Sequence, residues 1–338
     1  YKVSGHWDHY RDGMFVVDAS GEEMALRPMT CPFQFQIYNA AKRSYRELPI
    51  RYNETSYLFR NESSGEMHGL IRLRQFTLSE GHIICRMPQL EEEFEKALDL
   101  INYVMTTLDL KDYWYRFSKW DPKNKKGKYI DNPQAWEQSQ KVLKKILDKN
   151  KMKYIEAEGE AAFYGPKLDI QMKNVYGKED TIITVQIDFA LPERFDMSYV
   201  NESGKEERPI IIHRSSIGCY ERTMALLIER YAGAFPTWLS PVQAIIIPVS
   251  EKSNGWGEKV LAELNTAGLR AELDDGDESL GKRIRNAEKQ KTPYILVVGE
   301  KEQKDKSVAV RKRGQGDLGA TKLDKFIEKI KKEIEEKK

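Results

Sequence analysis

Cysteine is scarce in this sequence, with three residues in 338, too few for the disulfide framework of a small secreted protein. No apolar run approaches about 18 residues, and no charged-then-apolar leader begins the chain, so we expect neither membrane insertion nor secretion but a cytoplasmic location. The 55 basic and 53 acidic residues leave a net charge of +2. A nucleic-acid partner therefore has to be argued from local patches.

Local metal motifs are absent as well. No two cysteines are spaced as CxxC, and the five histidines form no HExxH. A lone cysteine is usually a small buried hydrophobe, and Cys85 and Cys219 are interpreted in that way. The length is sufficient for two hydrophobic cores.

The most informative segment present is Glu54 to Cys85. Apolar residues alternate with polar ones on both sides of a polar, glycine-containing loop, which predicts two antiparallel strands. These apolar residues are Tyr57 and Phe59 before the loop and Leu70, Leu73 and Phe76 after it. Arg60 and Arg72 are suited to bidentate binding of phosphate oxygens. Glu62 could accept a hydrogen bond from an exocyclic amine, and Phe76 offers a face for a purine ring. The alternative is a surface hairpin with solvated ion pairs.

The sequence FRNE followed by HGLIRLRQF, with IGCYERTMALLIE at 217–229, resembles motifs 2 and 3 of the class II aminoacyl-tRNA synthetases. Within that class, five further segments resemble the threonyl-tRNA synthetase family in the same order: RPMTCP (27–32), GH (81–82), FYGPKLDI (163–170), VQIDFALP (185–192) and IIIHR (210–214). The resemblance implies ATP-dependent formation of threonyl-adenylate and transfer of threonine to tRNA(Thr).

The resemblance also implies one zinc ion, held by Cys31, His82 and His213. Three protein ligands leave a position open for substrate, as in catalytic zinc sites. In the family, the amino group and hydroxyl of threonine bind this zinc. A metal that demands an oxygen donor rejects valine, which has no hydroxyl. An apolar pocket alone distinguishes valine from threonine only about a hundredfold. Serine keeps both donor atoms, so editing is expected outside this chain.

Further roles are carried over from the family position by position. Arg60 and Arg222 are expected to stabilise the charge of the reacting phosphates, together with Mg²⁺. His6 is expected to assist the tRNA hydroxyl, and Lys167 lies among the catalytic positions. The ATP-binding set is Arg60, Glu62, Arg72, Phe76, Gln186 and Arg222, and the threonine-binding set is Arg60, Glu80 and Tyr164.

Three positions depart from the family pattern. Leu78 and Glu80 stand where many members have Gln and Asp, and Thr181 stands where Gln is frequent near the nucleotide. Glu80 keeps the charge of the aspartate but adds a methylene. These departures affect the details of threonine binding rather than the class of reaction.

Helical periodicity predicts helices over Pro88–Leu110, Pro133–Asn150 and about Glu221–Tyr231. The aromatic and basic stretch 114–129 is a weak candidate for RNA contact, because lysine-rich loops are usually only solvated. Two prolines in FPTWLSP place a boundary near 236–242. We therefore expect a catalytic domain over 1–240 and a second domain over 241–338.

Strands and helices alternate in the second domain, which predicts a smaller α/β fold. It resembles the anticodon-binding domain of the threonine, proline, histidine and glycine enzymes. By position, Glu302 and Arg311 are expected to bind anticodon bases, with an ordinary surface pair as the alternative. Lys282, Arg283 and Arg285 are candidates for phosphate contacts.

The expected fold is α+β, a class II antiparallel sheet with flanking helices followed by the smaller domain. Motif 1, which builds the family's dimer interface, has no counterpart here, so an N-terminally truncated chain and a homodimer of the full-length protein are expectations from the family alone. Two alternatives stay open: a related enzyme such as a prolyl-tRNA synthetase, and an RNA-binding paralogue without activity.

Overall fold

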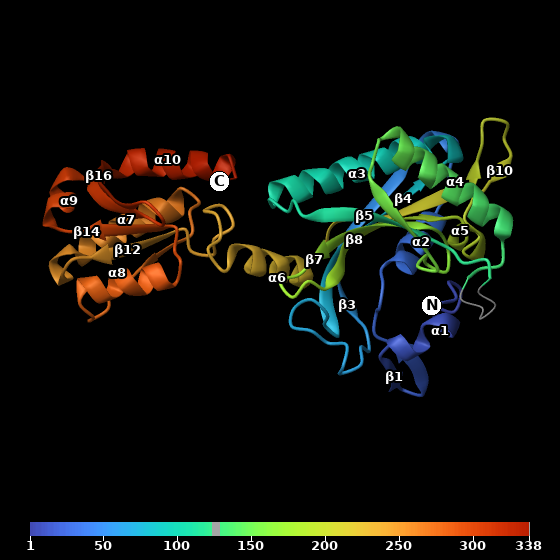
Figure 1. Ribbon diagram of the computed structural model, residues 1–338, viewed down its shortest axis with the longest axis horizontal. Helices are drawn as coiled ribbons and strands as arrows, with labels where there is room; N and C mark the ends of the chain where they lie inside the picture. Colours follow the sequence, from blue (N-terminus) through green and yellow to red (C-terminus); the bar gives the residue numbers. More distant parts are fainter. Residues whose placement is uncertain (124–128, 338) are drawn as a thin grey trace. The chain divides into compact units, whose positions relative to one another are not determined.

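The computed structural model describes residues 1–123 and 129–337. The chain divides into two compact units, Tyr1–Leu226 (unit 1) and Leu227–Lys338 (unit 2), which are drawn in Figure 1. Part of the basic stretch 114–129 lies outside the described residues. None of the helices in the described parts of the chain is both long and apolar enough to cross a membrane.

Unit 1 is built on a seven-stranded sheet. Every neighbouring pair of strands is antiparallel except the parallel pair at one edge, β5 and β6, so the expected antiparallel sheet is confirmed. In spatial order the strands are β3 (Ile50–Phe59), β4 (Gln75–Cys85), β11 (Ile210–Cys219), β8 (Glu179–Asp188), β7 (Lys167–Lys173), β5 (Tyr113–Lys119) and β6 (Tyr154–Glu158).

The register of this sheet aligns residues that are far apart in sequence. His82 on β4 lies opposite His213 on β11, and His213 lies opposite Gln186 on β8. Gln186 in turn lies opposite Lys167 on β7. Directly opposed residues of antiparallel strands project from the same face. One row across the sheet therefore carries four of the predicted site residues.

Helices cover both faces. α3 (Leu90–Thr107) packs across β11 and contacts β4 and β8, and α4 (Pro133–Lys149) lies beside it, as Figure 1 shows. The Asn132 side chain accepts from the Ala135 amide at 3.1 Å, which caps α4. α2 (Cys31–Asn39) covers the face that carries His82 and His213, through Phe35. The two long predicted helices are confirmed, each ending within three residues of the expected bounds.

The remaining elements of unit 1 are short, apart from a helix that continues into unit 2. They are α1 (His6–His9), β1 (Val16–Ala19), β2 (Glu22–Ala25), α5 (Leu191–Arg194), β9 (Tyr199–Val200), β10 (Glu206–Glu207) and α6 (Tyr220–Tyr231).

The predicted hairpin needs one correction. β3 and β4 do pair, but Leu70 and Leu73 are not strand residues, and Arg72 lies in the connecting loop, residues 60–74. The Ile71 and Arg72 amides both donate to the His68 carbonyl, which closes a turn at Gly69, where φ is +47°. The turn interrupts the alternation of apolar residues from which the strand was inferred.

Unit 2 has a five-stranded sheet in the order β13, β12, β14, β15, β16, parallel through the first three strands and antiparallel beyond. The predicted alternation of strands and helices is confirmed; α9 is a short helix, and β16 is an exposed, mostly polar strand. The elements are β12 (Ala244–Pro248), α7 (Asn254–Thr266), β13 (Ala271–Leu273), α8 (Leu280–Lys289), β14 (Tyr294–Val298), α9 (Glu300–Asp305), β15 (Ser307–Lys312), β16 (Gly316–Lys322) and α10 (Leu323–Glu335).

Arginines fix loops within unit 2. Arg270 donates to the carbonyls of Trp238 and Ser240 at 2.9 and 2.8 Å. Arg283 is buried and donates to the carbonyls of Asp274 and Pro248 at 2.8 and 2.7 Å. The expected phosphate contact by Arg283 is therefore wrong, because its guanidinium is already engaged inside the unit.

Candidate active site

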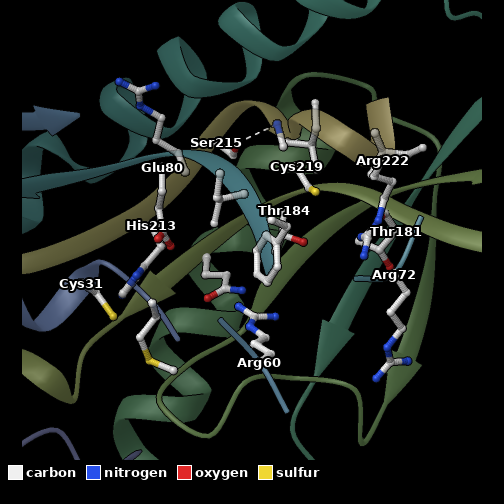
Figure 2. Close-up of a pocket in the computed structure, with 18 of the residues that line it drawn as sticks. Cys31, Arg60, Arg72, Glu80, Thr181, Thr184, His213, Ser215, Cys219 and Arg222 are labelled. Atoms are coloured by element: carbon white, nitrogen blue, oxygen red, sulfur yellow. Dashed lines mark hydrogen bonds between the residues drawn. The ribbon is translucent and has the colours of Figure 1, made fainter. Parts of the chain in front are cut away.

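A pocket of about 300 Å³ opens on the face of the unit 1 sheet that α2 covers. Its walls come from β4, β8 and β11, from the loop 60–74, from the start of α6 and from the N-terminal segment around His6. Figure 2 shows two ends, with Cys31 and His213 at one and Arg72, Thr181 and Arg222 at the other.

The first end contains a cluster of metal-ligand type. The donor atoms of Cys31, His82 and His213 lie within 4.8 Å of one another, and all three residues are buried. Cys31 is the first residue of α2, and the two histidines face each other across β4 and β11. The fold therefore brings together three residues that span 182 positions of sequence, from 31 to 213.

The outer nitrogens of both imidazoles contact side-chain oxygens. His82 Nδ1 lies 2.7 Å from Gln34 Oε1, and His213 Nε2 lies 2.8 Å from Asp188 Oδ2. Oxygens of this kind accept, so both outer nitrogens carry the proton. Asp188 is itself held in place, because its Oδ1 accepts from the amides of Ala190 and Leu191.

The inner nitrogens, His82 Nε2 and His213 Nδ1, then face each other at 2.9 Å. Burial lowers the pKa of His82 well below its usual value, which favours a neutral ring. A neutral His82 ring that is protonated at Nδ1 directs the lone pair of Nε2 toward His213. One sulfur with two imidazole nitrogens is a donor set used by zinc sites.

At the other end, Arg222 is fixed from two sides. Its Nε donates to the Ile71 carbonyl at 3.0 Å, and its Nη1 donates to the Thr181 carbonyl. Burial lowers the pKa of Arg222 from the ordinary arginine value. Both bonds leave a side of the guanidinium for an anionic ligand, since an arginine has five N–H donors.

Arg60 and Arg72 have different partners. The Arg60 guanidinium lies 5.0 Å from the Phe76 ring centroid, and its Nε is 3.3 Å from the Pro28 carbonyl. Arg72 is bound by carboxylates, with Nη2 2.7 Å from Glu62 Oε2 and 3.5 Å from Glu66 Oε1. A polyanion at Arg72 can use the N–H donors that these carboxylates leave or compete with them for the others.

Tyr164 and Glu80 lie at the end of the pocket that contains the histidine cluster. The Tyr164 hydroxyl donates to Gln186, and its ring stacks on His213 with centroids 4.9 Å apart. Glu80 accepts from the Thr30 hydroxyl and lies 3.9 Å from His82 Nε2. The longer carboxylate noted in the sequence is therefore at the end of the pocket that contains the Cys-His-His cluster.

Family models match nearly all of both units. The tRNA synthetase class II core domain (G, H, P, S and T) matches residues 10–231, and the anticodon binding domain matches residues 243–333. The solved RNA binding domain of threonyl-tRNA synthetase from Cryptosporidium parvum Iowa II is 35% identical, with a TM-score of 0.91, over 98% of this chain and 82% of that chain. The chain belongs to the threonyl-tRNA synthetase family of class II enzymes.

Two other members extend the comparison. A threonine–tRNA ligase of Clostridium botulinum is 61% identical over 338 residues, covering 99% of this chain and 52% of that protein. A putative threonyl-tRNA synthetase from Aeropyrum pernix is 26% identical, with a TM-score of 0.80, over 99% of this chain and 80% of that one. The chain spans about half the length of the curated relatives it matches. The family resemblance is thus confirmed.

In this member of the threonyl-tRNA synthetase family, two predicted catalytic positions differ in their access to the pocket. His6 lines it, with Nδ1 2.7 Å from Ser4 Oγ. Lys167 is not among the lining residues, and its Nζ lies 3.2 Å from the buried Asp169.

The sequence reasoning missed several contributors. Gln34 and Asp188 orient the histidines, and Thr30 holds Glu80. Asp188 lies inside VQIDFALP, one of the segments that resemble the family, so the sequence could have indicated a role for it. No local motif indicated a role for Gln34. Cys85 is buried in the core as predicted, but Cys219 lines the pocket, where its thiol donates to Glu221 at 3.2 Å.

In unit 2 of this family member, the two predicted anticodon residues occupy different surroundings. Glu302 accepts from the Gly299 amide at 2.9 Å and caps α9. Arg311 lines a pocket of about 230 Å³, where it lies 3.7 Å from Glu288 and 3.5 Å from Asp317. Glu302 does not line that pocket.

Proposed function

We propose that this chain is the aminoacylation part of a threonine–tRNA ligase, which makes threonyl-adenylate and pyrophosphate from threonine and ATP and then transfers threonine to tRNA(Thr). Residues 1–240 are the proposed catalytic domain and 241–338 the proposed anticodon-binding domain. Dimerisation stays a prediction from the family. One observation carries the proposal: Cys31 and His213 of the Cys-His-His cluster line the same pocket as three arginines, Arg60, Arg72 and Arg222.

Cys31, His82 and His213 are the proposed zinc ligands. When bound, zinc supplies a Lewis acid that selects an amino acid with both an amine and a hydroxyl. Gln34 and Asp188 keep the imidazole donors aimed inward through the 2.7 and 2.8 Å contacts. Glu80 and Tyr164, at the same end, are proposed to orient the substrate ammonium and hydroxyl.

The arginine end is proposed to bind ATP with Mg²⁺. Arg60 holds the α-phosphate and the threonine carboxylate, and Arg222 and Arg72 hold the departing pyrophosphate. Guanidinium groups fixed beforehand stabilise the charge that develops at phosphorus. Glu62 and Phe76 are proposed to bind adenine, and Gln186, which accepts from Tyr164, is also in the proposed ATP-binding set.

Amino-acid-dependent ATP–pyrophosphate exchange on zinc-quantified protein tests the activity. We expect exchange with threonine, weaker exchange with serine, none with valine, and loss of all exchange after zinc removal. Exchange with proline instead would identify a related enzyme of the subgroup. Absence of exchange in the zinc-loaded protein would favour the RNA-binding alternative and contradict the proposal.

Replacing Arg311 by alanine is expected to lower kcat/KM for tRNA charging by about tenfold or more, since a guanidinium contact to a base edge is worth about 1–3 kcal/mol. Exchange with threonine needs no tRNA and is expected to stay unchanged. The pocket around Arg311 is about 230 Å³, sufficient for part of a base.

Lys325→Ala is the matched control, because Lys325 is an exposed residue of α10 that pairs with a neighbouring surface carboxylate, Glu328. Equal losses of charging and exchange in the Arg311 variant would show that Arg311 acts on folding rather than on tRNA.

A further inference from the structure

His6 lies at the pocket wall as a buried imidazole with 5% of its surface exposed. Its ring packs edge-on against Phe163, with centroids 5.1 Å apart. Burial is the largest of the causes that lower the pKa of His6 to about 3. The ring is therefore neutral in the free protein, and what matters chemically is which of its two nitrogens carries the single proton.

The contacts of Ser4 determine that choice. Ser4 is fully buried, and its hydroxyl donates to the Tyr1 carbonyl at 3.0 Å. A hydroxyl has one proton, and a carbonyl has none to give, so the Ser4 oxygen is left as an acceptor. The 2.7 Å contact between Ser4 Oγ and His6 Nδ1 is then satisfied by a proton on Nδ1.

The other nitrogen of the ring is left without a proton. Within residues 1–123 and 129–337, the His6 ring makes one side-chain hydrogen bond, at Nδ1. In the same residues, Nε2 is not one of the side-chain atoms that are both buried and without a hydrogen-bond partner. An unprotonated Nε2 on a pocket-lining ring can accept a proton from a substrate.

We propose that Ser4 is a positioning residue that fixes His6 in the Nδ1-protonated tautomer and so presents Nε2 as the proton acceptor in threonyl transfer. This inference rests on the proposed function. In the step, the 2′ or 3′ oxygen of the terminal adenosine forms an ester bond to the threonyl carbonyl carbon. The bond from that carbon to the phosphate oxygen breaks, AMP leaves with the bonding pair, and the hydroxyl proton passes to Nε2.

The opposite arrangement makes a different prediction. If the Ser4 hydroxyl donated to Nδ1, Nε2 would carry the proton and could not accept another, and the 3.0 Å contact with the Tyr1 carbonyl would have no hydrogen in it. The tautomer therefore distinguishes the two arrangements without any assay of activity.

Nitrogen-15 NMR of histidine-labelled protein measures the tautomer. The chain has five histidines, and a His6→Gln variant assigns the His6 signals. We expect a protonated Nδ1 and an unprotonated Nε2 in the unaltered protein, and a shift toward the Nε2-protonated form in Ser4→Ala. A protonated Nε2 in the unaltered protein overturns the inference, whether or not the chain charges tRNA.

Single-turnover transfer from preformed adenylate tests the consequence. Ser4→Ala is expected to slow transfer about tenfold, which is part of the rate enhancement that a general base contributes. Threonine-dependent exchange is expected to stay unchanged. In a His6→Gln background the same substitution is expected to have no further effect. Additive losses would show that Ser4 acts on packing and not through His6, which also overturns the inference.

Ser139→Ala is the matched control. Ser139 is another buried serine of unit 1, whose hydroxyl donates to the Ala135 carbonyl at 2.8 Å inside α4, outside the pocket lining. It is expected to leave both the His6 tautomer and the transfer rate unchanged. If exchange is absent in every variant, the proposed function fails while the NMR result still decides the tautomer.

Discussion

Alanine in place of His82 is expected to remove the bound metal and to lower threonine-dependent exchange by at least about 100-fold, because even residues that only orient metal ligands contribute about 10- to 100-fold. His82 is fully buried, so water does not reach the vacated position freely. Metal content by mass spectrometry, measured alongside exchange, checks both parts of the expectation.

Cys85→Ala is the control, since Cys85 lies on the same strand as His82 and is fully buried but is not part of the cluster. Asp188→Asn is expected to give an intermediate loss of metal. It keeps an oxygen for the amides of Ala190 and Leu191 while weakening the contact to His213. Full activity in a metal-free His82 variant would exclude the metal from threonine activation.

Arg60→Ala is expected to lower kcat for adenylate formation by about 10²–10³-fold, the loss typical of removing one preorganised donor from a developing negative charge. Arg60 is the most informative of the three arginines to change. Arg222 also holds two backbone carbonyls, and Arg72 is paired with carboxylates. Pre-steady-state measurement of adenylate formation checks the effect.

Arg60→Lys separates charge from geometry, because lysine keeps the charge but loses the planar fork. Its loss is expected to lie close to that of Arg60→Ala if bidentate binding matters. Arg43→Lys, which alters a surface ion pair with Glu47, is the control. An Arg60→Ala variant with normal adenylate formation would refute the role assigned to this side chain.

The sequence predicted elements best where periodicity is strong. α3 and α4 bury one face each, so their apolar residues recur at helical spacing and their bounds were nearly right. The loop 60–74 was partly mistaken for a strand because Leu70 and Leu73 mimic alternation while Gly69 permits a turn. β16 has a weak sequence signal because it is exposed and contains two glycines, Gly316 and Gly319.

Site residues were predictable only in part. Cys31, His82 and His213 have no local signature, and spacing alone did not reveal them; the family resemblance did. Their proximity depends on strand register, which places His82 opposite His213, and on α2 packing against that row. Register and packing are long-range properties that a sequence pattern does not encode directly. For the same reason Ser4 had no predicted role beside His6.

The position of Cys31 at the start of α2, opposite two histidines on neighbouring strands, has a thermodynamic consequence. A ligand bound by all three joins a helix to the sheet beneath it and is absent from the unfolded chain. Its binding free energy then adds to the free energy of unfolding, by RT ln(1 + [L]/Kd). The residues proposed to select the amino acid would thereby also cross-link unit 1, and we expect scarcity of the proposed metal to weaken the fold together with the chemistry.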